Sequence, residues 1–537
     1  MGGDRAMRLR TAAIIALPVA FLGYFFVYPL ATILLTGLSS GDAGSAFAAV
    51  VTDPILRSVA WFTLWQAVAS TVLTFAVGLP AAYVFARYSF PGRSVFRALT
   101  LVPFVLPTLA VATAMLALLG PTSPFGIDLR GTVWIILIAH VFYNLAIVIR
   151  GVGSFWEHID PSIERAARVL GASRIRTFLE VTLPLLRPAI LSAAALVFLF
   201  TFTSFGVVLV LGDLSHTTIE VEIWRQTTSF RRLDIAAALA IFQLVGVGLI
   251  LFAYSRASQV RQLQLPYRPP GETLRRPRTA GERWFVGGTL AVLAVIVVIP
   301  IAVLVGKSLT TATGFGFENY TSLFTPTLGV TAPNAIGNTL RFAIPAVLIA
   351  TLIGMLAAVS IAYERGRIGR VFDTALMLPL GASAVMIGFG FLVALDEPID
   401  LRTSVILIPI AHSLVAIPFI VRSTVPAMRS IQHRLREAAA VLGASPAVVW
   451  REIDLPIISR AVAVGAAFAF AISVGEFGAT AFIVRRTSTT IPVAIFRLLG
   501  RPGSFGRAMA LSVMLMGLAA IAALAVEALR GATTGDI

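Results

Sequence analysis

Long apolar runs that contain no charged residue dominate this sequence and limit what the chain can fold into. A helix that crosses the hydrocarbon core of a bilayer needs about 20 mostly apolar residues. Twelve stretches meet that requirement, one of them interrupted by Glu476. They are residues 11–41, 58–86, 98–127, 131–149, 188–212, 235–255, 284–306, 342–363, 374–395, 403–421, 461–484 and 508–526. The sequence therefore predicts an all-α integral membrane protein with twelve transmembrane helices.

The composition agrees with a protein whose solvent is lipid. Hydrophobic residues make up 58% of the chain and charged residues 13%, whereas a soluble domain has about 45–50% apolar and about 25% charged residues. A cytosolic globular enzyme, a disordered protein and a fibrous protein are thereby excluded. The chain has no cysteine, which excludes disulfides, thiolate metal sites and cysteine nucleophiles. Residues 319–340 carry no charge but are rich in Thr, Asn and Pro, so we expect an external loop there.

The basic residues predict the orientation of the chain. The net charge is +16, and cytoplasmic loops of membrane proteins carry an excess of Lys and Arg. If the N-terminus lies inside and the spans alternate, most of the basic residues fall in inside loops, so both termini are predicted to be cytoplasmic. One external loop disagrees, and the sequence suggests only contact with an acidic partner for it. Its basic residues are Arg485, Arg486, Arg497, Arg501 and Arg507.

The two halves of the chain resemble each other. An offset of 272 residues places Ile138–His140 on Ile410–His412, and Val169–Ser173 on Val441–Ser445. Six predicted helices precede the junction and six follow it, so the halves have the same orientation and form a parallel repeat. We expect a first repeat over residues 1–255, a polar cytoplasmic linker over 256–283 and a second repeat over 284–537. Such a duplication is typical of transporters, whose pathway lies between the repeats.

Each half has one long cytoplasmic loop between its fourth and fifth predicted helices. In the second half, Glu437-Ala438-Ala439 favours helix, and Gly443 can end that helix in the left-handed region. Ser445 and Pro446 can start another short helix as its N-cap and first residue. Leu455-Pro456 then leads into the next span. The pattern predicts two short helices joined by a sharp turn at the membrane surface.

This spacing resembles the EAA loop of the permease subunits of binding-protein-dependent ATP-binding-cassette (ABC) importers. Residues 437–456 match it at every fixed position, whereas the first loop has Arg165 in place of the Glu and Val181 in place of the Ile. Glu164 lies one residue earlier and is expected to substitute for the missing acid in part. An amphipathic surface helix in each loop is the simpler alternative. The residues that the resemblance assigns to coupling with the ATPase are Glu164, Arg165, Ala166, Ala167, Gly171, Leu183, Pro184, Glu437, Ala438, Ala439, Gly443, Ile453, Leu455 and Pro456.

The resemblance also implies the partners of the chain. The permease of that family works in the bacterial cytoplasmic (inner) membrane with an extracytoplasmic solute-binding protein and two copies of an ABC ATPase. The chain itself would then be a transport subunit without a catalytic site or cofactor, with ATP and Mg²⁺ on the partner, and with lipid but no nucleic acid around it. The P-loop-like string at 305–308 is rejected, because Ile301 stands where that motif requires glycine.

Ionisable residues inside spans are costly and are candidates for the translocation pathway. Glu476 is the carboxylate well inside a span, and its counterpart in the first half is Ser204. We expect Glu476, Phe477, Ser204 and Phe205 to line the pathway. A structural pairing of Glu476 with Arg485 or another group stays open. The matched His140 and His412 are expected to form the same interhelical hydrogen bond in each half, and no metal site is expected.

The substrate is indicated only by resemblance. The string Glu476–Thr480 resembles the fifth helix of permeases for sulfate, molybdate, ferric iron and thiamine, and the fusion of both halves narrows this to the thiamine and ferric-iron types. Residues 202–206 and 217–224 look more like the thiamine type, so thiamine or a derivative is favoured and ferric iron is the alternative. A twelve-helix secondary transporter, with Glu476 and His140 as a proton relay, is the alternative from another class, but it leaves the paired loops unexplained.

Overall fold

The computed structural model describes residues 15–39, 43–258, 273–325, 331–363, 367–397 and 399–531. Most of the described chain is helical, and its strands are those of one short hairpin, β1 (Thr310–Thr311) and β2 (Gly314–Phe315). Within the described part, ten helices are long and apolar enough to cross a membrane, and two bent helix pairs raise this to as many as twelve. Residues 259–272 of the predicted linker 256–283 lie outside the described residues.

The elements of the first half follow in chain order. They are η1 (Gly23–Val27), α2 (Tyr28–Ser39), α3 (Ala43–Thr52), α4 (Pro54–Arg87), α5 (Arg93–Leu99), α6 (Val102–Val105), α7 (Thr108–Leu119), α8 (Val133–His158), α9 (Pro161–Val169), α10 (Arg174–Thr177), η2 (Phe178–Thr182), α11 (Leu183–Phe202), α12 (Gly206–Leu211), α13 (Ile219–Thr228) and α14 (Leu233–Ser258).

The second half repeats most of this order. Its elements are α16 (Ala280–Ser308), the hairpin, α17 (Glu318–Thr321), η3 (Ser322–Phe324), α18 (Ala332–Tyr363), α19 (Arg367–Gly381), α20 (Ala384–Ala394), α21 (Leu407–Ser430), α22 (His433–Val441), α23 (Pro446–Val449), η4 (Trp450–Asp454), α24 (Leu455–Gly475), α25 (Thr480–Ile483), η5 (Arg486–Ser488), α26 (Ile491–Leu499) and α27 (Phe505–Gly531).

The third predicted span of each half is a bent pair of helices rather than one straight helix. The chain turns by 103° between residues 93–105 and α7, and by 91° between residues 372–379 and α20. In the first half, Leu106 is extended because it precedes Pro107, which disfavours helical backbone at the residue before it. In the second half, Ser383 restarts the helix as an N-cap, with its hydroxyl accepting from the Met386 N–H. The stretches 98–127 and 374–395 are apolar enough to have been predicted as one span each. Their apolar composition gives no sign of the bend inside them.

The external loop expected over 319–340 is shorter than predicted. Helix α18 begins at Ala332, so only the part before it forms turns and short helices. Pro333 lies in the first turn of α18, where the missing N–H costs no hydrogen bond. The prediction was wrong there because the Thr- and Asn-rich composition outweighed this helix-start signal. Residues 326–330 lie outside the described part.

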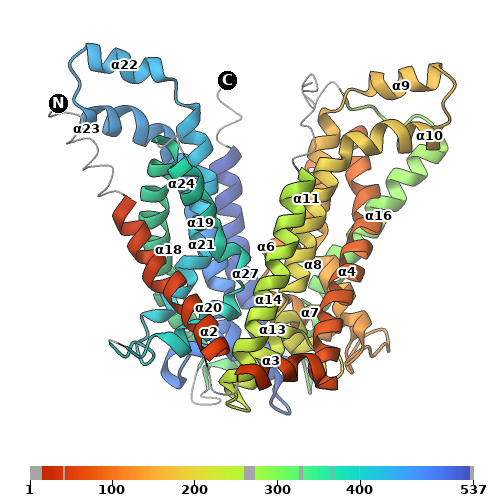
Figure 1. The fold of residues 1–537 in the computed structure, drawn as a ribbon. Helices are drawn as coiled ribbons and strands as arrows, with labels where there is room; N and C mark the ends of the chain where they lie inside the picture. Colours follow the sequence, from red (N-terminus) through yellow and green to blue (C-terminus); the bar gives the residue numbers. More distant parts are fainter. Residues whose placement is uncertain are drawn as a thin grey trace.

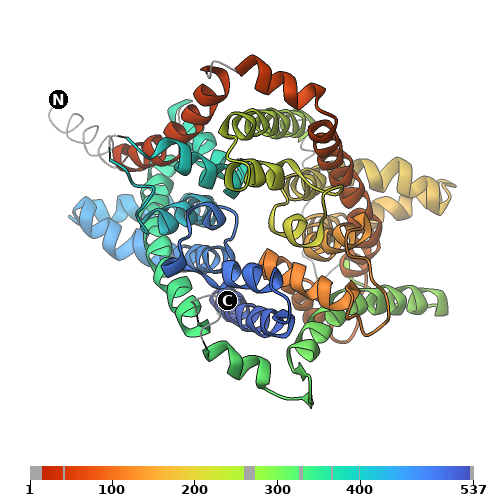
Figure 2. The same cartoon turned by 90° about the horizontal axis from the view of Figure 1, so that it is seen from below.

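The two halves exchange their first helices. Helix α2 packs on α20 of the second half as well as on α14 of its own half, and α16 packs on α7 of the first half as well as on α27. Phe25 and Phe391 meet edge to face with 6.3 Å between their ring centroids. Figure 2 shows both crossings from the end of the molecule opposite α9 and α22. The repeat units of the sequence are therefore not two separate bodies.

The halves are joined at one end and diverge toward the other. Helices α9 and α10 project from one half and α22 and α23 from the other, at the same end of the molecule (Figure 1). A large apolar cluster joins the halves away from that end, with Phe205, Met386 and Phe477 among its buried members. The site therefore has two parts: two projecting loops, and the interface between the halves.

Candidate functional site

The two projecting loops end their first helix in the same way. Gly171 and Gly443 adopt φ of +89° and +85°, the left-handed conformation that glycine tolerates best. In the second loop the N–H groups of Gly443 and Ala444 donate to the carbonyls of Ala440 and Ala439, at 3.0 and 2.9 Å. This is the Schellman motif that closes a helix C-terminus, and the first loop forms the same pair of bonds. The predicted turn at Gly443 is confirmed.

A bridge inside each loop fixes the first helix against the segment that returns to the membrane. In the first loop, Glu164 accepts from Thr182 and from Arg87, both at 3.1 Å. At the equivalent positions of the second loop, Arg436 pairs with Asp454 at 2.8 Å. Glu164 thus holds the loop together, and its expected role as a partial substitute for the missing acid stays a prediction. Arg165 and Glu437 are both exposed.

Each loop presents two apolar side chains to solvent at its tip. Val169 and Leu170 are 86% and 88% exposed, and the equivalent Val441 and Leu442 are both 87% exposed. Large apolar side chains this exposed, at the same place in both halves, indicate a surface that another protein covers. The resemblance to the EAA loop did not assign these four residues, although they lie between its Ala-Ala and Gly positions.

The fifth span of each half is broken at equivalent positions. Helix α11 ends at Phe202 before α12 starts at Gly206, and α24 ends at Gly475 before α25 starts at Thr480. At the second break, the Glu476 carboxylate accepts from the Ala479 and Thr480 N–H groups at 2.8 and 3.1 Å, and from the Thr480 hydroxyl. It therefore caps α25 from inside the protein. The helix breaks leave backbone groups at membrane depth, which is tolerated where the backbone is buried or lines a cavity.

The two matched histidines reach these breaks. His140 contacts the hydroxyls of Ser70 and Ser204, both at 2.9 Å. His412 contacts Ser473 and Thr480 at 2.7 and 2.8 Å, and its Nε2 lies 3.1 Å from a Glu476 carboxylate oxygen. Each histidine thus makes interhelical hydrogen bonds, and each Nε2 reaches the break in the fifth span, but the Nδ1 partners differ: Ser70 of α4 for His140 and Ser473 of α24 for His412. The structural partner of Glu476 is His412, not Arg485.

Four aromatic rings close the interface between the halves. Phe205 and Phe477 stack with 5.4 Å between centroids and 20° between planes. On the next short helices, Trp224 of α13 and Phe496 of α26 occupy equivalent positions in the two halves. These two rings meet edge to face with 5.9 Å between their centroids. Two further contacts join the pairs, so the quartet is continuous. Helix α13 lies toward the end opposite α9 and α22 (Figure 1), so the interface is sealed on that side.

A cavity of about 310 Å³ lies beside this quartet, where the bent third spans meet the broken fifth spans. All four predicted pathway residues, Ser204, Phe205, Glu476 and Phe477, line it. Its walls also hold residues that the sequence did not single out, listed by the half that supplies them: Phe104, Tyr143, Phe200 and Glu220 from the first, and Ser383, Phe419 and Phe468 from the second. The sequence did not predict Glu220 as a site residue, because α13 is short and carboxylates in a short helix are typical of the surface.

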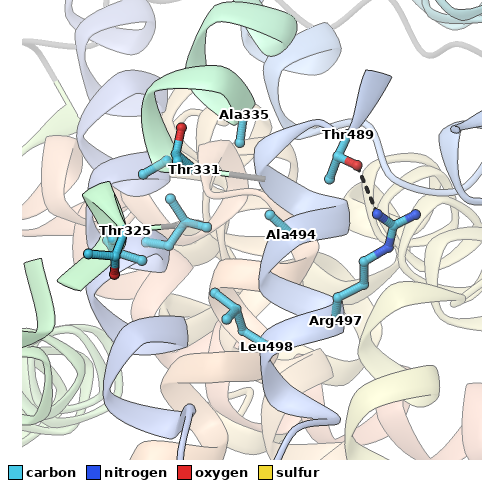
Figure 3. A pocket seen from close by; sticks show the side chains of 10 residues that line it. Thr325, Thr331, Ala335, Thr489, Ala494, Arg497 and Leu498 are labelled. Carbon is cyan, nitrogen blue, oxygen red and sulfur yellow. Dashed lines mark hydrogen bonds between the residues drawn. The ribbon is translucent and has the colours of Figure 1, made fainter. Parts of the chain in front are cut away.

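The external arginine cluster is largely bonded within the protein. Arg497 donates to the Thr489 hydroxyl at 2.8 Å, and Arg507 donates to Ser322 at 3.1 Å. Figure 3 shows Arg497 turned toward Thr489 beside a small pocket of about 30 Å³. That volume is close to what one water molecule needs, so this pocket is too small for a solute. Arg486 and Arg501 remain exposed.

Comparison with known proteins agrees with this geometry. Residues 75–265 and 350–532 each match the family described as binding-protein-dependent transport system inner membrane component. The thiamine transport system permease protein ThiP of Brucella abortus is 29% identical over 97% of this chain and 98% of its own. ThiP of Escherichia coli is 28% identical over 84% and 85%, and the sulfate permease CysT of Salmonella typhimurium is 31% identical over 38% of this chain and 77% of its own.

One solved structure, of a bacterial ABC transporter that imports alginate, superposes with a TM-score of 0.43 and 17% identity over 48% of this chain and 99% of that chain. The family match alone covers well over half of the sequence, in two copies that coincide with the structural repeats. This chain therefore belongs to the binding-protein-dependent transport system inner membrane components, with two copies of that domain fused in one polypeptide.

Proposed function

We propose that this chain is the permease subunit of an ATP-driven importer that moves thiamine or a derivative of it into the cytoplasm. The observation that carries the proposal is the pair of projecting loops, which have the same Schellman turn and the same exposed apolar tip in both halves. They stand at one end of a duplicated membrane core whose interface is closed at the other end. A push on both loops from that side would act on both halves at once.

The partners follow from the same geometry. Each loop is the docking site for one copy of a separate ABC ATPase subunit, which gives two ATPases for each permease chain, with ATP and Mg²⁺ bound by those subunits. The end that carries α9 and α22 then faces the cytoplasm, and both termini lie on that side of the inner membrane. The opposite end receives the solute from an extracytoplasmic binding protein. No catalytic residue or cofactor is assigned to this chain.

Thiamine is favoured over ferric iron by the relatives of this chain. The relatives that match over nearly the full length are named as thiamine permeases.

The alternative of an ion-coupled carrier with a Glu476–His140 relay is disfavoured. Glu476 is bonded to His412, not to His140, and His140 has serine hydroxyls at both ring nitrogens.

Uptake by the reconstituted complex tests the proposal. The permease, its ATPase and its binding protein would be placed in liposomes, and radiolabelled thiamine would be offered with ATP inside. We expect accumulation that stops when ATP is replaced by a non-hydrolysable analogue. Uptake of thiamine that needs an ion gradient and not ATP would overturn the proposal, as would ATP-driven uptake of ferric iron in place of thiamine.

A further inference from the structure

The cavity between the halves contains a buried carboxylate that lacks a full set of partners. Glu220 has no exposed surface. One carboxylate oxygen, Oε1, accepts from the Gln243 amide of α14, and the other, Oε2, makes no hydrogen bond. The Ser383 hydroxyl of the opposite half approaches the same carboxylate. It does not form a hydrogen bond of ordinary length and angle with Oε2. A buried polar oxygen without a partner costs about 1–3 kcal/mol, and more when it is charged, so this arrangement needs a reason.

The other carboxylate of the cavity is satisfied. Glu476 bonds two backbone N–H groups, the Thr480 hydroxyl and His412. Glu220 therefore differs from Glu476 in kind: one caps a helix, and the other presents a free oxygen to the cavity. The amide oxygen of Asn144, which is also buried and lines the cavity, likewise lacks a partner. Both unsatisfied groups are acceptors.

The charged side chains that line the cavity are acidic. Among the described residues that line it there are two glutamates and no arginine or lysine, in a chain whose net charge is +16. Neither glutamate recurs in the other half, since Ser204 stands opposite Glu476 and Pro492 stands opposite Glu220. The cavity is thus asymmetric in charge although the fold around it is repeated.

The walls suit flat rings. Phe104 lies 5.9 Å from Tyr143 and 6.3 Å from Phe200 on the side of the first half. Phe419 and Phe468 stack at 6.3 Å on the side of the second half. Aromatic faces attract cations and stack on planar ligands. The volume of about 310 Å³ lies at the lower end of the range of about 300–1,000 Å³ found for small-molecule pockets.

We propose that this cavity is a transit site for a flat organic cation, and that Glu220 neutralises the charge of that cation. The inference rests on the proposed function, because thiamine, with its positively charged thiazolium ring and its planar pyrimidine, is a ligand of this class. It adds that the membrane subunit itself holds the solute after release from the binding protein, between the aromatic quartet and the open side of the interface.

The test compares Glu220→Gln with Glu220→Asp and Glu222→Gln in the reconstituted complex. Glu222 is two residues away on the same helix, bonds Gln226 and faces Arg225, and does not line the cavity, so its variant is a matched loss of charge. At saturating binding protein, we expect Glu220→Gln to lower thiamine uptake about tenfold or more, since the attraction between the carboxylate and the cation is lost. Glu220→Asp keeps the charge and should restore much of the uptake. Compared at equal membrane abundance, Glu222→Gln should stay within about twofold of wild type, because Glu222 does not line the cavity.

A second measurement separates the inference from the proposed function. Equilibrium dialysis of thiamine against the purified permease–ATPase complex, without binding protein, reports on the cavity alone. If wild type takes up thiamine and Glu220→Gln takes it up equally well at equal membrane abundance, the transit site is overturned. The proposed function then still stands. Binding that depends on Glu220, without any uptake by wild type, would support the site and overturn the proposed function. If wild type shows no uptake and no binding, both the transit site and the proposed function are overturned.

Discussion

Equivalent positions in the two halves make equivalent contacts with different types of side chain. Residue 164 and residue 436 bridge to residue 182 and residue 454 in both loops, yet one bridge is Glu to Thr and the other is Arg to Asp. His140 meets Ser204 where His412 meets Glu476. The fold therefore requires a contact at these places and tolerates more than one way of making it. Residues that differ between halves without such a partner, above all Glu220, are the ones to examine for function.

The exposed acid of the second loop should matter more than its counterpart in the first. Glu437 lies on the outer surface of α22, so Glu437→Lys should leave the fold intact and disturb ATPase docking by reversing a charge. We expect uptake to be abolished at normal membrane abundance. Arg165→Glu should be milder, because the first loop already lacks the acid. Uptake and ATPase pull-down measured together check this, and normal uptake by Glu437→Lys would show that α22 does not form the docking surface.

The buried acid at residue 476 should act on stability. Glu476→Gln keeps the shape but places an amide nitrogen where the carboxylate accepts from N–H and O–H donors. A mismatched buried bond costs about 1–3 kcal/mol, so we expect a lower thermal midpoint and lower membrane abundance. Ser204→Ala, at the equivalent position, removes one hydrogen bond and should cost less. A wild-type midpoint for Glu476→Gln, with uptake lost, would instead assign this carboxylate to the solute.

At the scale of helices, close packing is repeated as faithfully as the loops. A Cβ on Gly354 of α18 would lie 2.7 Å from Ile420 of α21, and a Cβ on the equivalent Gly78 of α4 would lie 2.7 Å from Val148 of α8. These pairs form the most extensively packed helix contacts of each half. Small residues let membrane helices approach closely when lipid gives no hydrophobic drive to associate.

Filling that contact should destabilise the protein. Gly354→Ala overpacks the α18–α21 interface, which costs about 1–3 kcal/mol in a well-packed core, so the thermal midpoint of the purified protein should fall by several degrees. Gly288→Ala is the matched control, because a Cβ there meets nothing within 4 Å and alanine is the better helix former. Equal midpoints for the two variants would mean that the helices are free to separate at Gly354.

The elements show how far the sequence could predict the structure. Apolar length located the spans, and the offset between halves located the repeat, because both depend on local composition and order. Both Schellman turns follow from one glycine at a fixed place after a helical run. The bends at Leu106 and Ser383 have local signals, Pro107 and a serine N-cap, which the apolar runs outweighed in the prediction. The crossing of α2 to α20 and the burial of Glu220 were not predictable, because each depends on which helix lies opposite. Short helices such as α13, which pack inside the membrane domain with charged residues, gave no apolar signal at all.

At the scale of the whole molecule, two projecting loops stand on the halves that enclose the central cavity of the described residues. The exchanged first helices and the shared apolar cluster join the halves at the closed end, whereas the loops stand on separate halves at the other end (Figure 1). Drawing the loops together would therefore change the interface that contains the cavity. Under the proposed function, this geometry would give ATP hydrolysis on the partner subunits a mechanical route to the solute through the helices.

Site-specific cross-linking to the ATPase tests this account most directly. The chain has no cysteine, so Leu170→Cys and Leu442→Cys each create a single reactive thiol at an exposed loop tip. Leu214→Cys is the matched control, because Leu214 is also 82% exposed but lies on the connection between α12 and α13. With a short thiol-reactive photo-cross-linker, we expect each loop variant to capture one ATPase, the double variant to capture two, and the control none. Capture at Leu214, or at neither loop, would contradict the account.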